Sequence, residues 1–187
     1  MLYEIATEHD GVFTAGEARE SGVSPHALIQ AERRGNVRRL SRGIYRLKNY
    51  PVDDERAQLW EAVLWPTLRR GPDADYGVLS HLTALHLNYP LLEYAPPKVH
   101  VTIPPNLRVR RAPPSWLDIH FGHIAGKDVT NAVGGLPMTK LERTLFDCIA
   151  ARVDRRLINR VIDAAVHHEI PDVVDARTVA KLRTALG

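Results

Sequence analysis

The first stretch of the chain alternates short segments of apolar residues with turn residues. Apolar positions at helical spacing predict a helix over Leu2–His9, which ends at Gly11. Thr14 is followed three residues later by Glu17, and this spacing is typical of a capping box. The pattern therefore predicts a second, short helix over Ala15–Glu20.

A third helix is predicted from Pro25 to Arg34. Ser24 provides the N-cap oxygen, and proline is tolerated at the first helical position because its missing N–H would have no helical partner there. Gly35 suits the left-handed residue that often ends a helix. With a glycine turn at Gly22 between the second and third helices, the pattern predicts a helix-turn-helix unit.

The third helix has two different faces. Leu28 and Ala31 lie on one side of a helical wheel, and His26, Gln30 and Arg33 lie on the other. A glutamine can pair with adenine and an arginine with guanine or phosphate, so this face can read a major groove. The same spacing is equally typical of an ordinary solvated helix face.

A hairpin is predicted directly after this helix. Spaced apolar residues flank "SRG", and Gly43 suits a three-residue hairpin loop. The apolar positions that can hold the hairpin to a core are Val37, Leu40, Ile44 and Leu47. Helix, turn, helix and hairpin together predict a winged helix-turn-helix in residues 1–50.

The charge of the chain is concentrated on this wing. The net charge is only +3, yet the stretch from Arg33 to Lys48 holds seven basic residues and no acidic one. The rest of the chain has 18 basic and 22 acidic residues, a net charge of −4. A patch of one sign indicates a polyanion partner, here double-stranded DNA. The predicted DNA contacts are Ser24, His26, Gln30, Arg33, Arg34, Arg38, Arg39, Arg42, Arg46 and Lys48.

Residues 51–187 follow a mixed pattern of helices and strands. Asp53 or Asp54 caps a predicted helix that Pro66 ends or kinks, and Ser80 is a candidate N-cap for a short apolar helix. Two stretches alternate apolar and polar residues and predict strands over 99–103, at a sheet edge, and over 117–121. The fold class expected is α/β, or α+β overall.

Three helices are predicted in the last fifty residues. Thr139 and Glu142 have the spacing of a second capping box before an apolar helix. A helix is expected over Asp154–His168, and Asp175 caps a last helix that ends near Leu186.

This second region shows no motif for catalysis, cofactor binding or metal binding. The D…[DE]-x-K signature of metal-dependent nucleases and the P-loop signature are both absent. His81 and His86 are five residues apart, a poor metal spacing on a helix, and we expect structural or surface roles for them. Cys148 is expected to be a buried thiol, and Asp147 to form an ion pair with Arg143.

A second basic cluster follows the strand that is predicted over 99–103. Arg108, Arg110 and Arg111 lie in a proline-flanked loop, where they can add phosphate contacts or simply be solvated. No run of 18 apolar residues predicts a membrane span, and the acidic start of the chain does not resemble a signal peptide. With a single cysteine in addition, we expect a cytoplasmic protein that makes no membrane contact.

The stretch "GVFTAGEARESGVSPHALIQAERRGNVRRLSRGIYRL" resembles the winged-helix domain of AbiEi-type antitoxins. "LSHLTALHLN", "VHVTIP" and "GLPMTKLERTLFDCIA" resemble the blocks that follow in that family. The resemblance implies a type IV toxin–antitoxin regulator that represses its own operon, with a C-terminal domain that counteracts a nucleotidyltransferase-like toxin. It places the DNA-binding surface on the third helix and the wing.

Two other functions stay open at this point. The chain can be a stand-alone transcription regulator whose second domain binds a small ligand. It can also be a nucleic-acid-modifying enzyme that the same N-terminal domain targets, although some relatives of that kind have a nuclease-like tail whose signature this chain lacks.

Overall fold

A computed structural model describes residues 2–67, 76–89, 95–107, 109, 111–167 and 174–187. The protein contains helices and two sheets, which confirms the predicted mixed α/β class. The chain forms two compact units. The first comprises Met1–Gly77, Leu107–Val109 and Asn131–Pro137, and the second comprises Val78–Asn106, Arg110–Thr130 and Met138–Gly187.

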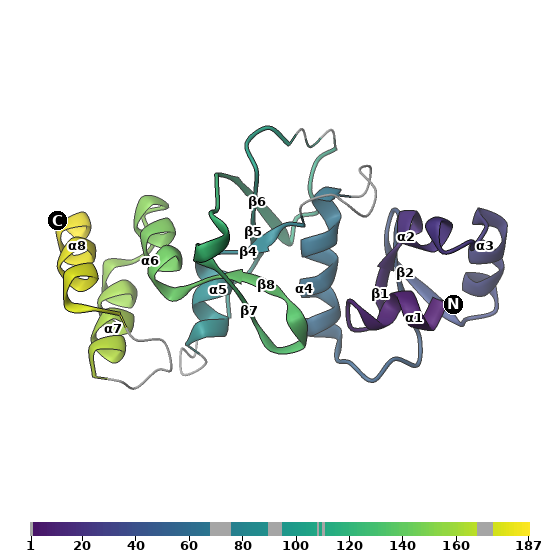
Figure 1. The fold of residues 1–187 in the computed structure, drawn as a ribbon, viewed down its shortest axis with the longest axis horizontal. Coiled ribbons are helices and arrows are strands. Elements are labelled where there is room, and N and C mark those ends of the chain that lie inside the picture. Colours follow the sequence, from purple (N-terminus) through teal and green to yellow (C-terminus); the bar gives the residue numbers. More distant parts are fainter. Residues whose placement is uncertain (1, 68–75, 90–94, 108, 110, 168–173) are drawn as a thin grey trace. The chain divides into compact units, whose positions relative to one another are not determined.

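The first unit begins with the predicted helix-turn-helix and wing (Figure 1). Its elements are α1 (Leu2–Thr7), β1 (Val12–Thr14), α2 (Ala15–Glu20), α3 (Pro25–Arg33), β2 (Val37–Ser41) and β3 (Ile44–Leu47). The sheet order is β1-β3-β2, and both pairings are antiparallel. The short strand β1 was not predicted, and it makes the wing part of a three-stranded sheet rather than an isolated hairpin.

The predicted caps of the N-terminal helices are present. The amide of Glu17 donates to the hydroxyl of Thr14 at 3.1 Å, and the amide of Thr14 donates to the Glu17 carboxylate at 2.7 Å. The hydroxyl of Ser24 accepts from the amide of Ala27 at 3.1 Å, with Pro25 at the start of α3. These bonds satisfy amides that have no partner within a helix, so the sequence fixes where α2 and α3 begin.

A small apolar core holds this part of the unit together. Leu28 is the buried residue of α3, and Val37 and Tyr45 are buried on β2 and β3. The full cluster is Ala6, Phe13, Ala18, Val23, Leu28, Val37 and Tyr45. Because each N-terminal element contributes to it, the wing and α3 have fixed positions on one scaffold.

Helix α4 (Asp54–Leu64) belongs to the same compact unit. Asp53 caps it by accepting from the amide of Arg56 at 2.7 Å, and a 3₁₀ turn at Trp65–Thr67 follows it. The indole N–H of Trp60 donates to the Asp10 carboxylate at 3.3 Å. The predicted division into residues 1–50 and 51–187 stays a prediction about folding domains.

The second unit contains a mixed sheet of order β6-β5-β4-β8-β7. Its strands are β4 (Val78–Leu79), β5 (Val99–Ile103), β6 (Leu117–Phe121), β7 (Val129–Asn131) and β8 (Pro137–Thr139). Strand β5 pairs in parallel with β6 and antiparallel with β4. The expected edge position of β5 is therefore wrong: its flanking prolines lie outside the paired residues, and β6 is the edge strand.

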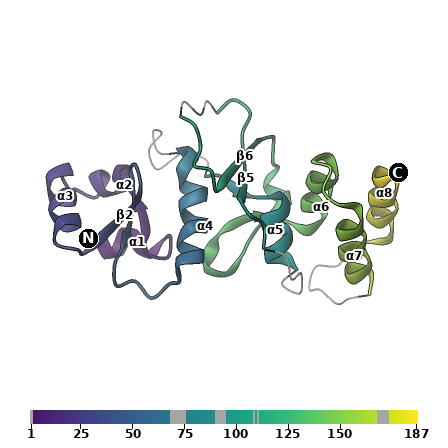
Figure 2. The same ribbon diagram turned by 180° about the vertical axis from the view of Figure 1, so that it is seen from behind.

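The helices of this unit are α5 (His81–Asn88), α6 (Leu141–Ala150), α7 (Arg155–Val166) and α8 (Ala176–Leu186). Helices α6, α7 and α8 lie beside one another in both views (Figures 1 and 2) around a buried cluster that includes Leu145, Cys148 and Ile158. Asp175 caps α8, as predicted, and Asp154, the expected first residue of the preceding helix, is the N-cap of α7. The expected last residue of the first of these helices, His168, lies outside the described residues.

The second capping box is absent. Lys140, not Thr139, is the N-cap residue of α6, and it makes no side-chain cap bond. The Thr139 hydroxyl is buried and lies 2.7 Å from the hydroxyl of Thr144. The prediction was wrong because this hydroxyl has a buried partner on α6, which a sequence spacing does not reveal.

Candidate DNA-binding surface and histidine pocket

Helix α3 presents a polar face to solvent. Ser24, His26, Arg33 and Arg34 are exposed, and Gln30 is half-buried, while Leu28 faces the core. The helix is short and capped at its first turn, so its polar side chains project from a fixed backbone. This arrangement can enter a major groove.

Strand β2 adds a row of exposed cations beside the helix–turn–helix. Val37 is buried, whereas Arg38 and Arg39 are exposed. Arg42 at the hairpin turn and Lys48 after β3 are also exposed. Both arginines lie in the regular part of the register, which shifts only between Arg39 and Ser41, and β2 is an edge strand of its sheet.

Arg46 has a different environment from the other wing arginines. It is 8% exposed, forms an ion pair with Asp54 and donates to the carbonyl of Val52. Arg38 also lies 3.2 Å from the Asp54 carboxylate. The hydrogen bond from Arg46 and the nearby charge of Arg38 lower the pKa of Asp54. Arg46 therefore braces β3 against the start of α4, and we leave it out of the proposed DNA surface.

The second predicted basic cluster is only partly described. Arg108 and Arg110 lie outside the described residues, and Arg111 is half-buried. A phosphate contact by these three arginines stays a prediction.

The second unit has polar side chains on one face of its sheet. In the parallel pair of β5 and β6, His100 is opposite Asp118, and Thr102 is opposite His120. Side chains of paired residues point to the same face, so these four lie together. The hydroxyl of Thr83 on α5 accepts from the amide of His100 at 2.8 Å, which ties that helix to the strand.

Three histidines meet on this face. The rings of His81 and His120 are stacked with centroids 3.6 Å apart, and His100 Nδ1 lies 3.0 Å from His120 Nε2. His81 has a left-handed backbone (φ 50°), and its Nδ1 lies 2.9 Å from the hydroxyl of Ser80. Burial lowers the pKa of His81 to about 3 and that of His100 to about 4, and it lowers the pKa of His120 as well. All three rings are therefore neutral near neutral pH.

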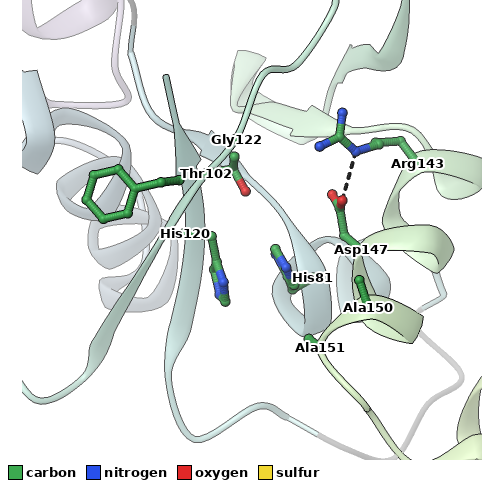
Figure 3. A pocket seen from close by; sticks show the side chains of 9 residues that line it. His81, Thr102, His120, Gly122, Arg143, Asp147, Ala150 and Ala151 are labelled. Atoms are coloured by element: carbon green, nitrogen blue, oxygen red, sulfur yellow. Dashed lines mark hydrogen bonds and ion pairs between the residues drawn. The ribbon is translucent and has the colours of Figure 1, made fainter. Parts of the chain in front are cut away.

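A pocket of about 330 Å³ opens beside these rings. It is lined by His81, Thr102, His120, Phe121, Gly122, Arg143, Asp147, Ala150 and Ala151. Figure 3 shows the two histidine rings facing each other, with the predicted ion pair of Arg143 and Asp147 on α6 beside them. That pair is 2.8 Å long, and Arg143 also donates to the carbonyl of His123 at 2.9 Å. One oxygen of Asp147 is buried without a hydrogen-bond partner.

This group of histidines was not predicted from the sequence. The spacing of His81 was compared only with that of His86, which is on the same helix. In the fold its neighbours are His100 and His120, which are on two strands. Both strands were predicted, and a parallel pairing of the two would have brought their even-numbered residues together. No pattern in either strand reveals that pairing, because 13 residues separate them and the intervening segment has no periodicity.

The N-terminal part of the chain matches a known protein family. No curated protein matches the chain. In the described part of the chain, no helix is both long and apolar enough to cross a membrane. Residues 1–48 match the family model described as "Transcriptional regulator, AbiEi antitoxin", which names regulators rather than enzymes. The resemblance drawn from the sequence is thereby confirmed over residues 1–48, where the chain is similar to transcriptional regulators of the AbiEi antitoxin family.

Proposed function

We propose that this protein is a cytoplasmic antitoxin that represses its own type IV toxin–antitoxin operon and counteracts a nucleotidyltransferase-like toxin. The observation that carries the proposal is the row of exposed arginines on β2 next to the polar face of α3. This surface lies within the residues that match the AbiEi model. The toxin and its neutralisation rest on the family resemblance.

The two parts of the surface have different roles in the proposal. Gln30 and Arg33 face the bases in the major groove, where each good pairing contributes ~1–3 kcal/mol of discrimination. Arg38, Arg39 and Arg42 contact phosphates, as wing residues of this fold do when they lie along the backbone. The wing therefore supplies affinity and α3 supplies sequence preference.

The test is binding of the full chain to the DNA upstream of its own gene, measured at several salt concentrations. Replacing Arg38, Arg39 and Arg42 together by alanine should weaken binding to all sequences. It should also flatten the plot of log K against log salt by about 0.9 for each lost phosphate contact.

A matched control removes three exposed arginines from α7 and α8. The variant with Arg156, Arg160 and Arg177 replaced by alanine has the same net charge as the wing variant. It should bind like the parent, apart from a small uniform effect of net charge. Equal binding by the wing variant and the parent would show that the wing does not contact DNA.

Replacing Gln30 or Arg33 tests the role of α3. Each change should narrow the difference in affinity between the operator and base-substituted operators by ~1–3 kcal/mol, with little change in salt dependence for Gln30. An equal loss of affinity for all DNA sequences would instead show that these side chains contact the DNA backbone.

A second candidate function is a stand-alone regulator whose second unit binds a small ligand. The pocket beside His81 and His120 favours it. Co-expression with the adjacent gene separates the two candidates. Rescue from a toxic nucleotidyltransferase-like product supports the antitoxin, whereas the absence of such a gene supports the ligand-binding regulator.

A further inference from the structure

Two imidazoles and a carboxylate converge on one face of the β5–β6 pair. The ring nitrogens of His100 and His120 and a carboxylate oxygen of Asp118 all lie within 4.8 Å of one another. We propose that His100, Asp118 and His120 form a binding site for one divalent transition-metal ion of the zinc class. This inference concerns the second unit alone and does not rest on the proposed DNA binding.

The strands place the three donors without any special loop. His100 and Asp118 are opposite each other in the parallel register, and His120 follows Asp118 by two residues on the same face. The ligands therefore come from two adjacent strands, whose hydrogen bonds fix the spacing of the backbones. Sites built on paired strands hold their ligands more accurately than sites built on loops.

The distances are close to those that a metal ion requires. Zinc–nitrogen bonds of about 2.0–2.1 Å place two tetrahedral ligand atoms about 3.3 Å apart. The two ring nitrogens are 3.0 Å apart, and His100 Nδ1 lies 4.0 Å from Asp118 Oδ2. The side chain of Asp118 is 43% exposed, so it is free to rotate and bring its carboxylate oxygen closer to His100 Nδ1.

The surroundings keep the imidazoles in the form that binds metal. The facing nitrogens of His100 and His120 are 3.0 Å apart, which neutral rings satisfy when one donates and the other accepts. When a metal ion binds between them, the donating ring changes to its other tautomer. Its proton then sits on the ring nitrogen that faces away, and both facing lone pairs are free to bind the metal.

His81 is a neighbour of this site rather than a fourth ligand. Its ring lies against the face of His120, whereas a metal ion lies in the plane of the ring that binds it. Its Nδ1 is 2.9 Å from the hydroxyl of Ser80. His81 therefore fixes the orientation of His120. The half-exposed carboxylate of Asp118 leaves the remaining coordination position open to solvent, as in sites with three protein ligands.

The donor types select the class of metal. Imidazole nitrogen with one carboxylate suits zinc, cobalt, nickel, copper or ferrous iron, whereas magnesium and calcium prefer oxygen-only ligands. We therefore expect binding of Zn²⁺ and Co²⁺ but not of Mg²⁺.

The experiment titrates the metal-stripped full chain with Zn²⁺ and Co²⁺ in the absence of DNA. One equivalent should bind, and Co²⁺ should produce visible absorption bands typical of nitrogen and oxygen ligands. His100→Ala, His120→Ala and Asp118→Asn should each weaken binding by at least about tenfold, because each removes one of three ligands. Excess Mg²⁺ should not displace the bound ion.

His123→Ala is the matched control, because this histidine is exposed just after β6 and is not among the three donors. It should bind metal like the parent. Circular dichroism checks the fold of each variant, and Asp118→Asn is the decisive change because it replaces a half-exposed side chain on the edge strand by one of the same shape. Unchanged affinity in folded Asp118→Asn, equal loss in His123→Ala, or no one-to-one binding by the parent would each overturn the proposal.

Discussion

Arginines of the wing differ in role according to their burial. Arg39 is exposed, whereas Arg46 is 8% exposed and bridges Asp54 and the carbonyl of Val52. We expect Arg46→Ala to lower the free energy of unfolding by roughly 1–3 kcal/mol, because the Val52 carbonyl loses its donor and a buried side chain is removed. Arg39→Ala should change it by less than about 0.5 kcal/mol.

Thermal and urea unfolding of the two variants checks this prediction. DNA binding should show the opposite order at a temperature where both are folded: Arg39→Ala weakens it and Arg46→Ala does not. If Arg46→Ala unfolds like the parent but binds DNA poorly, Arg46 contacts phosphate and the bracing role is wrong.

His9 makes the stability of the first unit depend on pH. It is 4% exposed and lies against the rings of Trp60 and Tyr76. Burial lowers its pKa below the ordinary value of 6.5, although the carboxylates of Glu17, Glu8 and Asp10 act in the opposite direction. As the pH falls below 6.5, the unfolded chain binds a proton at this position that the folded chain does not. The contribution of His9 to stability is therefore complete above 6.5 and is lost on acidification.

Urea unfolding between pH 5 and pH 8 measures this effect. The parent should become less stable as the pH falls from 6.5, and His9→Phe, which keeps a ring in the same place, should show a smaller change over that interval. His26 is exposed, and His26→Phe serves as the control for replacing a histidine by phenylalanine at a position outside the core. An identical slope for His9→Phe and the parent would contradict the prediction.

Among the elements, two turns differ in what surrounds their glycines. Gly11 and Gly22 have nearly equal φ values of 87° and 84°. A Cβ at Gly11 would lie 2.5 Å from Cβ of Tyr50, whereas a Cβ at Gly22 would meet nothing within 4 Å. Gly22→Ala should cost about 1–2 kcal/mol for the left-handed backbone. Gly11→Ala should cost a further 1–3 kcal/mol or so, because the clash must be relieved by movement of the chain.

Urea unfolding gives the free energy of unfolding of each alanine variant. The difference between the two values measures the cost of the clash with Tyr50 separately from the cost of the left-handed backbone. Tyr50→Gly in the Gly11→Ala background should recover part of the loss, since it removes the contacting side chain. Equal destabilisation by the two alanine substitutions would show that the chain relaxes around the added methyl group without cost.

Elements with a cap and a long apolar period could be predicted from the sequence, and short elements could not. Helices α2, α3 and α4 begin where Thr14, Ser24 and Asp53 cap them, because these caps act within four residues. Strands β1, β4, β7 and β8 are two or three residues long, too short to show an alternation. Their positions depend on pairing partners far away in the chain.

The same limit applies to the candidate sites. The exposed arginines of β2 could be recognised from the sequence as a cluster of positive charge, because they are close together in the chain. The neutralising residue Asp54 lies just beyond that cluster, and only the fold shows that it pairs with Arg46 and Arg38. The histidines at positions 81, 100 and 120 are some twenty residues apart, so only the pairing of β5 with β6 and the start of α5 bring them together.

For the whole molecule, the proposals assign different tasks to different compact units. The exposed cations of α3 and β2 belong to the first unit, and the histidines with their pocket belong to the second. The net charge of +3 combines a strongly basic stretch of seven cations with a remainder of −4, and Asp54, the carboxylate that pairs with wing arginines, belongs to the same first unit. Operator binding and toxin neutralisation should therefore be separable by mutation.

The separation can be measured in cells that express the toxin and this protein from unrelated promoters. The variant with Arg38, Arg39 and Arg42 replaced by alanine should lose repression of a reporter under the native promoter by tenfold or more, because several phosphate contacts are lost together. It should still rescue growth as the parent does at equal protein level, since neutralisation is assigned to residues 51–187. Because the toxin is not under the native promoter, loss of rescue together with repression, in a variant that is folded and equally abundant, would mean that the wing arginines also take part in neutralisation and that the two functions are not separable.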